Sequence, residues 1–223
     1  MNKRTLITCI CISLCLLFAF SGVAYAATGE SIFSLAGKYY RAAQGTVGLS
    51  EANSNTIIAS YNGHNITVAM VEYNRNMNIL RDEASASKHD SDLEIAEQLI
   101  ANIILAEEAE KLGLSATKAE IDLMVENAIR SYSIPEGKAI LDDYCAGAGI
   151  SFEEYIELLR EQAPNVIARQ KLKNEIGKQY CEQKGIKYTH VNPPVDMIRA
   201  QEKYIAELIE QHKDDIVYYE VTQ

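Results

Sequence analysis

Residues 98–122 read QLIANIILAEEAEKLGLSATKAEID, and this stretch decides the expected fold. Its apolar residues recur every three or four positions over 99–106, which is the spacing of an amphipathic helix. Gly113 is placed to end that helix in a left-handed conformation. Thr117 and Glu120 then have the spacing of a capping box, in which each side chain accepts a hydrogen bond from the other residue's backbone N–H. The stretch therefore predicts two helices joined by a short turn.

Helices are expected over most of the remaining chain. Ser91 and Ser151 are each followed three residues later by a glutamate, so two more helices begin with a capping box. An earlier helix is expected from Val68, where the apolar residues take up a helical period. The last helix covers about residues 195–212.

Proline and glycine mark the other helix boundaries. Pro135 is expected to start a helix, because its fixed φ suits the first helical position. Gly147 and Gly149 are expected to end that helix. Pro164 is expected to kink or break the next one, since proline lacks the N–H and clashes with the preceding turn. The chain then continues as a helix to about Lys184.

A small β-sheet is expected at the two ends of this helical region. Residues 56–61 are β-prone, Asn62-Gly63 is a tight-turn signal, and a short second strand follows over 65–67. Residues 216–221 are also β-prone, and we expect them to pair with the first strand. The predicted fold is mainly α, with a hairpin and a C-terminal strand forming the sheet.

The N-terminus has the layout of a secretory signal. Lys3 and Arg4 precede the apolar run Leu6–Phe20. Ala24 and Ala26 then place small residues at both positions that a signal peptidase reads before it cuts after Ala26. Residues 1–26 are therefore expected to be removed and the mature protein to be extracytoplasmic, whether in the periplasm, in the envelope or secreted. The alternative is that the segment stays uncleaved as an anchor, which would be the only membrane contact expected. The apolar run Leu6–Phe20 is short for this role, because a membrane span needs about 20 apolar residues.

Residues 27–55 are expected to be a leader before the main domain at 56–223. Apolar residues between Ile32 and Ala43 indicate a short amphipathic helix, and Gly45–Asn55 has the composition of a linker. Loss of Lys3 and Arg4 with the signal changes the net charge from −10 to −12. So acidic a protein has no electrostatic attraction for nucleic acid or anionic lipid, whereas basic clients would suit it.

The mature chain keeps two of the five cysteines, Cys145 and Cys181. In an exported protein they can pair as a disulfide, and the alternative is two separate buried thiols. Two cysteines without nearby ligands do not form a zinc site. Known catalytic motifs, a phosphate-binding glycine loop included, are absent from the sequence. The histidines and the paired acids at 107–110 and 142–143 are typical of solvated surfaces. We therefore expect no enzyme activity, cofactor, ATP or metal.

The order of these elements resembles a known family. An Asn-Gly hairpin precedes QLI at 98–100, EEAEKLGLS at 107–115 and EID at 120–122, and SFEEY at 151–155 and LREQ at 159–162 follow. The chain over about 57–184 resembles the N-terminal chaperone domain of SurA-type and PrsA-type foldases, which is related to the chaperone module of trigger factor. This resemblance implies a helical chaperone domain that binds unfolded or nascent exported proteins.

The chain departs from that family at residues 184–194. Relatives commonly carry a parvulin-type prolyl isomerase domain between the helical part and a returning C-terminal helix and strand. Here only this short connector precedes the returning segment 195–223, so the resemblance implies the chaperone half alone. The leader also lies outside the likeness.

The expected binding surface is a cradle of exposed apolar side chains, because such patches mark interaction sites and methionine adapts to varied partners. The candidates are Met70, Met77, Met124, Tyr132, Ile134, Tyr144, Phe152 and Tyr155. The alternative for each is an ordinary core position.

The expected function is a secreted, non-catalytic holdase that needs no ATP. One alternative is a dedicated envelope adaptor that reuses the fold to bind one partner, and another is a prolyl isomerase. Whether the protein forms a homodimer is left open by the sequence.

Overall fold

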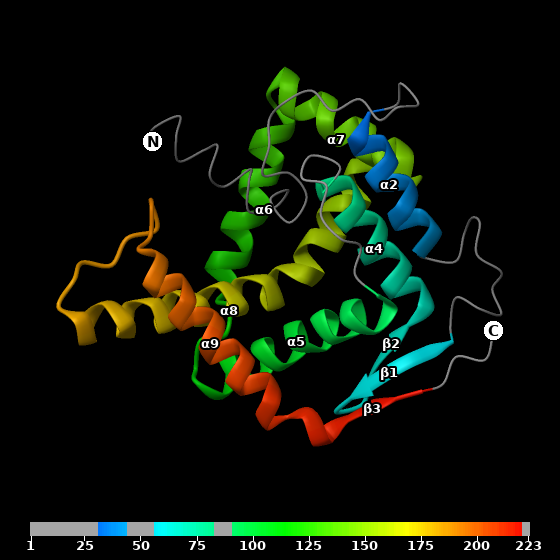
Figure 1. Cartoon of the computed structure of the whole chain (residues 1–223). Helices are drawn as coiled ribbons and strands as arrows, with labels where there is room; N and C mark the ends of the chain where they lie inside the picture. The colour runs from blue at the N-terminus through cyan, green and yellow to red at the C-terminus, as the bar shows by residue number, and fades with distance from the viewer. Residues whose placement is uncertain (1–30, 44–55, 83–90, 220–223) are drawn as a thin grey trace.

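The computed structural model describes residues 31–43, 56–82 and 91–219. Within them lie seven α-helices and a three-stranded antiparallel sheet (Figure 1). The elements are α2 (Ile32–Ala43), β1 (Ile57–Tyr61), β2 (His64–Thr67), α4 (Val68–Asp82), α5 (Asp92–Lys111), α6 (Lys118–Tyr132), α7 (Pro135–Ala148), α8 (Phe152–Lys184), α9 (Val195–Gln211), a 3₁₀ turn (Lys213–Asp215) and β3 (Ile216–Tyr218). The expected signal, its cleavage site at Ala26, the linker Gly45–Asn55 and the end of the sequence lie outside the described residues.

The expected mainly helical fold is confirmed, and local sequence explains the helix starts. Capping boxes open α5, α6 and α8, with Ser91, Thr117 and Ser151 each accepting a hydrogen bond from the backbone N–H of the glutamate three residues later. Pro135 occupies the first turn of α7, as expected. These short-range interactions satisfy backbone N–H groups that a helix start leaves free.

The sheet joins the two ends of the described domain in the order β2-β1-β3. Asn62 (φ 47°) and Gly63 (φ 80°) form the tight turn between β1 and β2, and both adopt the positive φ that this turn requires. β3 pairs antiparallel with β1, with Val217 opposite Ser60. The predicted return of the C-terminal strand to the first strand is confirmed.

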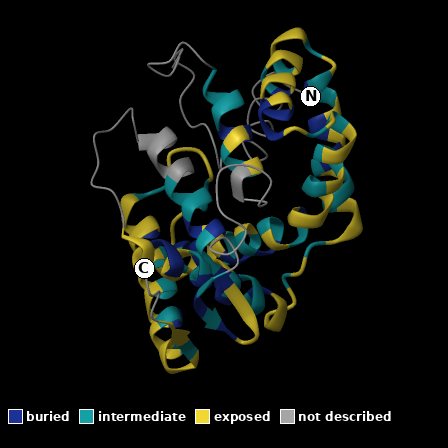
Figure 2. Ribbon diagram, turned by 90° about the vertical axis from the view of Figure 1, so that its right-hand side faces the viewer, coloured by how far each residue is buried: buried dark blue, intermediate teal, exposed yellow. Residues whose placement is uncertain are grey.

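The main core lies between the sheet, α5, α8 and α9. Buried side chains from these elements include Ile66, Ile100, Ile104, Leu172 and Leu208. Figure 2 shows the largest concentration of buried residues in this lower part of the molecule, around the sheet. The apolar stripe expected at 99–106 contributes to it, although the fully buried positions also include Leu105 and Ala109.

A second cluster forms where α2 packs across α7 and α4. The expected leader helix at 32–43 is therefore part of the helical body. Gly37 and Gly147 let the two backbones touch: a Cβ on Gly147 would lie 2.0 Å from the Ser34 carbonyl oxygen. The prediction that Gly147 ends a helix is wrong, because Gly147 is a contact residue within α7. Gly149 alone caps that helix, at φ 69°.

α8 is the longest helix, and it continues through Pro164 without a break. Figure 1 shows it bending as it crosses the molecule, with α9 returning beside it. α8 ends at Gly185, which adopts a left-handed cap conformation. Helices long and apolar enough to cross a membrane are absent from the described part of the chain.

Candidate binding groove

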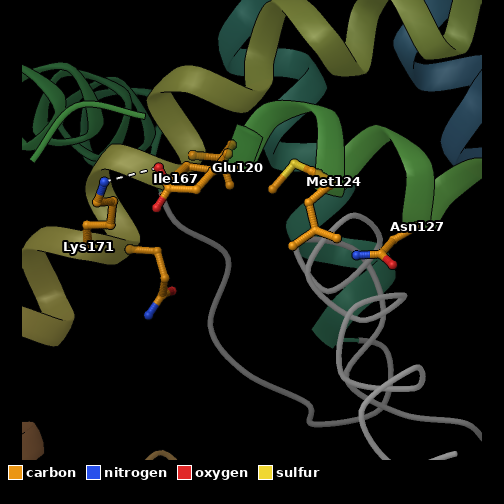
Figure 3. A pocket seen from close by; sticks show the side chains of 8 residues that line it. Glu120, Met124, Asn127, Ile167 and Lys171 are labelled. Atoms are coloured by element: carbon orange, nitrogen blue, oxygen red, sulfur yellow. Dashed lines mark hydrogen bonds and ion pairs between the residues drawn. The ribbon is translucent and has the colours of Figure 1, made fainter. Parts of the chain in front are cut away.

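An apolar groove of about 220 Å³ lies between α6 and α8 (Figure 3). Most of its lining surface is apolar. The lining residues are Glu120, Leu123, Met124, Asn127, Val166, Ile167, Gln170 and Lys171. An apolar cavity of roughly 150 Å³ can hold a benzene ring, so this groove has room for a large side chain.

Helical periodicity brings these residues onto two facing stripes. On α6 they fall at positions 120, 123, 124 and 127, and on α8 at 166, 167, 170 and 171. Residues three and four apart share one helix face. Leu123 is 53% exposed, so its side chain offers apolar surface to solvent at the groove. A partner with apolar side chains would bury that surface.

An ion pair closes one end of the groove. Lys171 Nζ lies 3.1 Å from Glu120 Oε2 (Figure 3). Lys171 also donates to the Ser115 carbonyl at 2.9 Å. The Thr117 backbone N–H, the Thr117 hydroxyl and Lys171 lower the pKa of Glu120. The carboxylate therefore stays charged and joins α6 to α8 at neutral pH.

A second cavity, of about 340 Å³, lies beside the β1–β2 turn and is mainly polar. Glu107 faces it, but Tyr61 and Asn62 donate to its two carboxylate oxygens at 3.2 and 3.0 Å. Burial lowers the pKa of Arg169 on the opposite wall. Charged side chains of both signs line this cavity, Glu107 and Arg169 among them, and its lining is less apolar than that of the groove.

Four of the expected binding residues pack against one another instead of forming an open surface. The Tyr132 ring stacks on Phe152 with centroids 3.7 Å apart, Phe152 meets Tyr155 at 6.1 Å, and Tyr155 meets Tyr144 at 5.8 Å. Tyr144 is buried. Neighbouring rings cover Tyr144, so it occupies the core position that was the alternative for each candidate. The row joins α6, α7 and α8.

The other expected binding residues do not come together. Met124 lines the groove, whereas Met70 is an exposed residue of α4 and Ile134 is half-buried at the N-cap of α7. Met77 belongs to α4, but its side chain lies outside the described residues. The groove therefore takes one residue, Met124, from the expected set.

Cys145 and Cys181 are free, buried thiols. Cys145 belongs to the cluster beneath α2, and Cys181 Sγ lies 3.7 Å from Met197 Sδ between α8 and α9. Of the two alternatives left open by the sequence, the structure has the separate thiols.

Most residues of the groove were not among those predicted from the sequence. Asn127 and Leu123 share a helix face with Met124, but a polar residue beside exposed apolar ones is typical of many helices. The signal that could have found them is the mixed stripe at 120, 123, 124 and 127, read together with Val166-Ile167 after Pro164.

Comparisons with protein-family models, with curated proteins and with solved structures gave no match to this chain.

Proposed function

We propose that this protein is a non-catalytic extracytoplasmic chaperone that holds unfolded or extended polypeptides without ATP. The observation that carries the proposal is the apolar groove between α6 and α8, with Leu123 and Met124 on its wall. Unfolded chains expose apolar side chains, and burying them is favourable in proportion to the area removed from water. Methionine adapts its shape to varied partners.

The secretion signal and the resemblance to SurA-type and PrsA-type chaperone domains support the same reading. The expected clients are exported proteins before they fold, and the mature charge of −12 favours basic ones. We propose that the protein works outside the cytoplasm after cleavage near Ala26. Its connector at 184–194 replaces the isomerase domain of the resembling proteins.

The test is aggregation suppression by the purified mature chain, Ala27 to Gln223. Light scattering follows two unrelated unfolding clients, without nucleotide. Protection of both at near-equimolar chaperone is expected. Protection of neither contradicts the proposal, and tight binding of one envelope protein instead would show a dedicated adaptor.

A matched pair of variants assigns the activity to the groove. Leu123 and Ile129 are both exposed on α6, at 53% and 48%, but only Leu123 lines the groove. A client can cover about half of the Leu123 side chain, worth about 1 kcal/mol or ~5-fold in affinity. Leu123→Ser should weaken client protection by that factor, and Ile129→Ser should leave it unchanged.

A further inference from the structure

Asn127 is an unexpected residue in this groove. Its side chain lines the apolar wall, and the residue is only 6% exposed. The amide oxygen Oδ1 is buried and has no hydrogen-bond partner, and the amide nitrogen donates to none of the described residues. Ser131 Oγ donates at 2.8 Å to the backbone carbonyl of Asn127, so that hydrogen bond does not involve the side-chain amide.

An unpaired buried amide is unfavourable, so it calls for a ligand group or another function. A carboxamide carries two donor hydrogens and an acceptor oxygen. No hydrogen bond fixes which of its two polar atoms faces the groove. A half-turn about the terminal torsion therefore presents either the donor or the acceptor to a bound molecule.

A peptide group has the complementary pair, one N–H and one C=O. Apolar side chains in the groove would bring a main-chain peptide group past Asn127. The Glu120–Lys171 pair offers no such partner, because those two side chains already satisfy each other. Gln170 on α8 also lines the groove, but it is exposed and its amide nitrogen donates to Asn174 at 2.9 Å. Among the described residues that line the groove, Asn127 is the buried polar side chain without a partner, and a peptide main chain can supply one.

The dimensions of the groove suit an extended segment. Asn127 lies seven residues along α6 from Glu120, which is about 10 Å at 1.5 Å per residue. An extended peptide covers that length with about three residues at 3.3 Å each. Figure 3 shows Met124 and Asn127 on α6, with Ile167 and Lys171 on α8.

We propose that the groove binds an extended apolar segment of a client, and that the unpaired amide oxygen of Asn127 turns to the groove and accepts a hydrogen bond from one main-chain N–H of that segment. This inference rests on the proposed chaperone function and names how the site recognises its ligand. Apolar side chains supply the affinity, and the amide fixes the register of the segment. A client residue without an N–H at that register, such as proline, is bound less well.

The test uses a short fluorescein-labelled peptide with an apolar centre flanked by lysines, and measures its binding to the mature chain by fluorescence anisotropy. A series of peptides carries one N-methyl group each, moved along the main chain. One hydrogen bond is worth ~0.5–1.5 kcal/mol, so N-methylation at a single position should weaken binding about 2- to 12-fold. Methylation elsewhere should have little effect.

Asn127→Leu provides the second arm. It should weaken binding of the unmodified peptide by a similar factor and abolish the effect of N-methylation at the sensitive position. Circular dichroism checks that the variant is folded. The N-methyl series on the unaltered protein does not depend on any variant, so the inference stays testable even if Asn127→Leu unfolds.

The outcomes separate the inference from the proposed function. If Leu123→Ser weakens peptide binding but every N-methyl peptide binds equally well, the role of Asn127 is overturned and the chaperone proposal stands. An N-methyl effect that persists in Asn127→Leu does the same. If Leu123→Ser leaves client protection unchanged, clients bind elsewhere and the groove is not the client-binding site. Failure to bind the peptide and to protect any client overturns both.

Discussion

Replacing Gly147 with alanine should detach α2 from α7. An added Cβ would lie 2.0 Å from the Ser34 carbonyl oxygen and 3.1 Å from the Lys38 backbone nitrogen. Gly37 mirrors this on α2, since its Cβ would lie 2.1 Å from the Tyr144 carbonyl oxygen. These neighbours are backbone atoms of packed helices, so no side chain can turn away to make room.

The sign of the stability change decides whether this packing exists in solution. In an isolated helix, alanine is more favourable than glycine by about 1 kcal/mol. In the packed structure, α2 must retreat by about 1.4 Å for the 2.0 Å approach to reach the ordinary contact distance of 3.4 Å. Overpacking costs ~1–3 kcal/mol, and we take the upper value because only backbone is involved. Gly147→Ala should therefore destabilise the protein by about 2 kcal/mol.

Two assays measure this effect. Urea unfolding gives the change in the free energy of unfolding. Thiol labelling reports the docking of α2, because Cys145 lies in the cluster beneath α2, where burial raises its pKa to about 11. Cys181, between α8 and α9, is the internal reference. We expect faster labelling of Cys145 in Gly147→Ala, with Cys181 unchanged.

Ala146→Gly is the matched control. Ala146 is an exposed residue of the same helix, so glycine there costs about 1 kcal/mol in helix propensity without touching α2. This control should lower stability and leave Cys145 labelling as it was. A Gly147→Ala variant that is more stable than the original protein, with Cys145 still protected, would refute the packing argument.

Three further predictions follow from other parts of the structure. Asn127→Leu should raise the free energy of unfolding by about 1–3 kcal/mol in a urea titration, because it removes an unpaired buried acceptor. A lower free energy of unfolding would show that the Asn127 amide has a hydrogen-bond partner. The Tyr219 amide, which donates to the Ile58 carbonyl at 2.9 Å, should exchange slowly with deuterium, and fast exchange would mean that this sheet edge is open. Burial, and then the Cys145 thiol, raise the pKa of Tyr155 to about 12 from an ordinary value of 10. Its contribution to stability is therefore full below pH 10 and is lost as pH rises to 12, so Tyr155→Phe should flatten the alkaline fall in a pH series of unfolding curves.

Local signals made the helices and the turn predictable. The capping boxes at Ser91, Thr117 and Ser151 act over three residues, so their sequence spacing is enough to place a helix start. The turn at Asn62-Gly63 depends on two residues that tolerate positive φ. The pairing of β3 with β1 also followed, because two β-prone segments at the ends of a helical chain need a partner.

Packing between helices was not predictable in the same way. The same residue type, glycine, caps α7 at Gly149 but serves as a contact at Gly147, and only the position of α2 distinguishes them. Tyr144 could not be told from an exposed binding residue, because its burial comes from distant rings. Asn127 was missed for a related reason: its isolation depends on which α8 residues face it.

The sheet order has a consequence for how the chain reaches its final form. β1 is the central strand, and its partner β3 comes from almost the last described residues. A polypeptide is made from its N-terminus, so β1 keeps one unpaired edge until the roughly 150 residues between it and β3 have also been made. Unpaired strand edges are prone to mispairing while folding is incomplete. Closing so distant a contact also costs loop entropy, which makes it a slow step. A protein proposed to shelter incomplete chains thus passes through a state that itself needs shelter, until residues 216–218 complete the sheet.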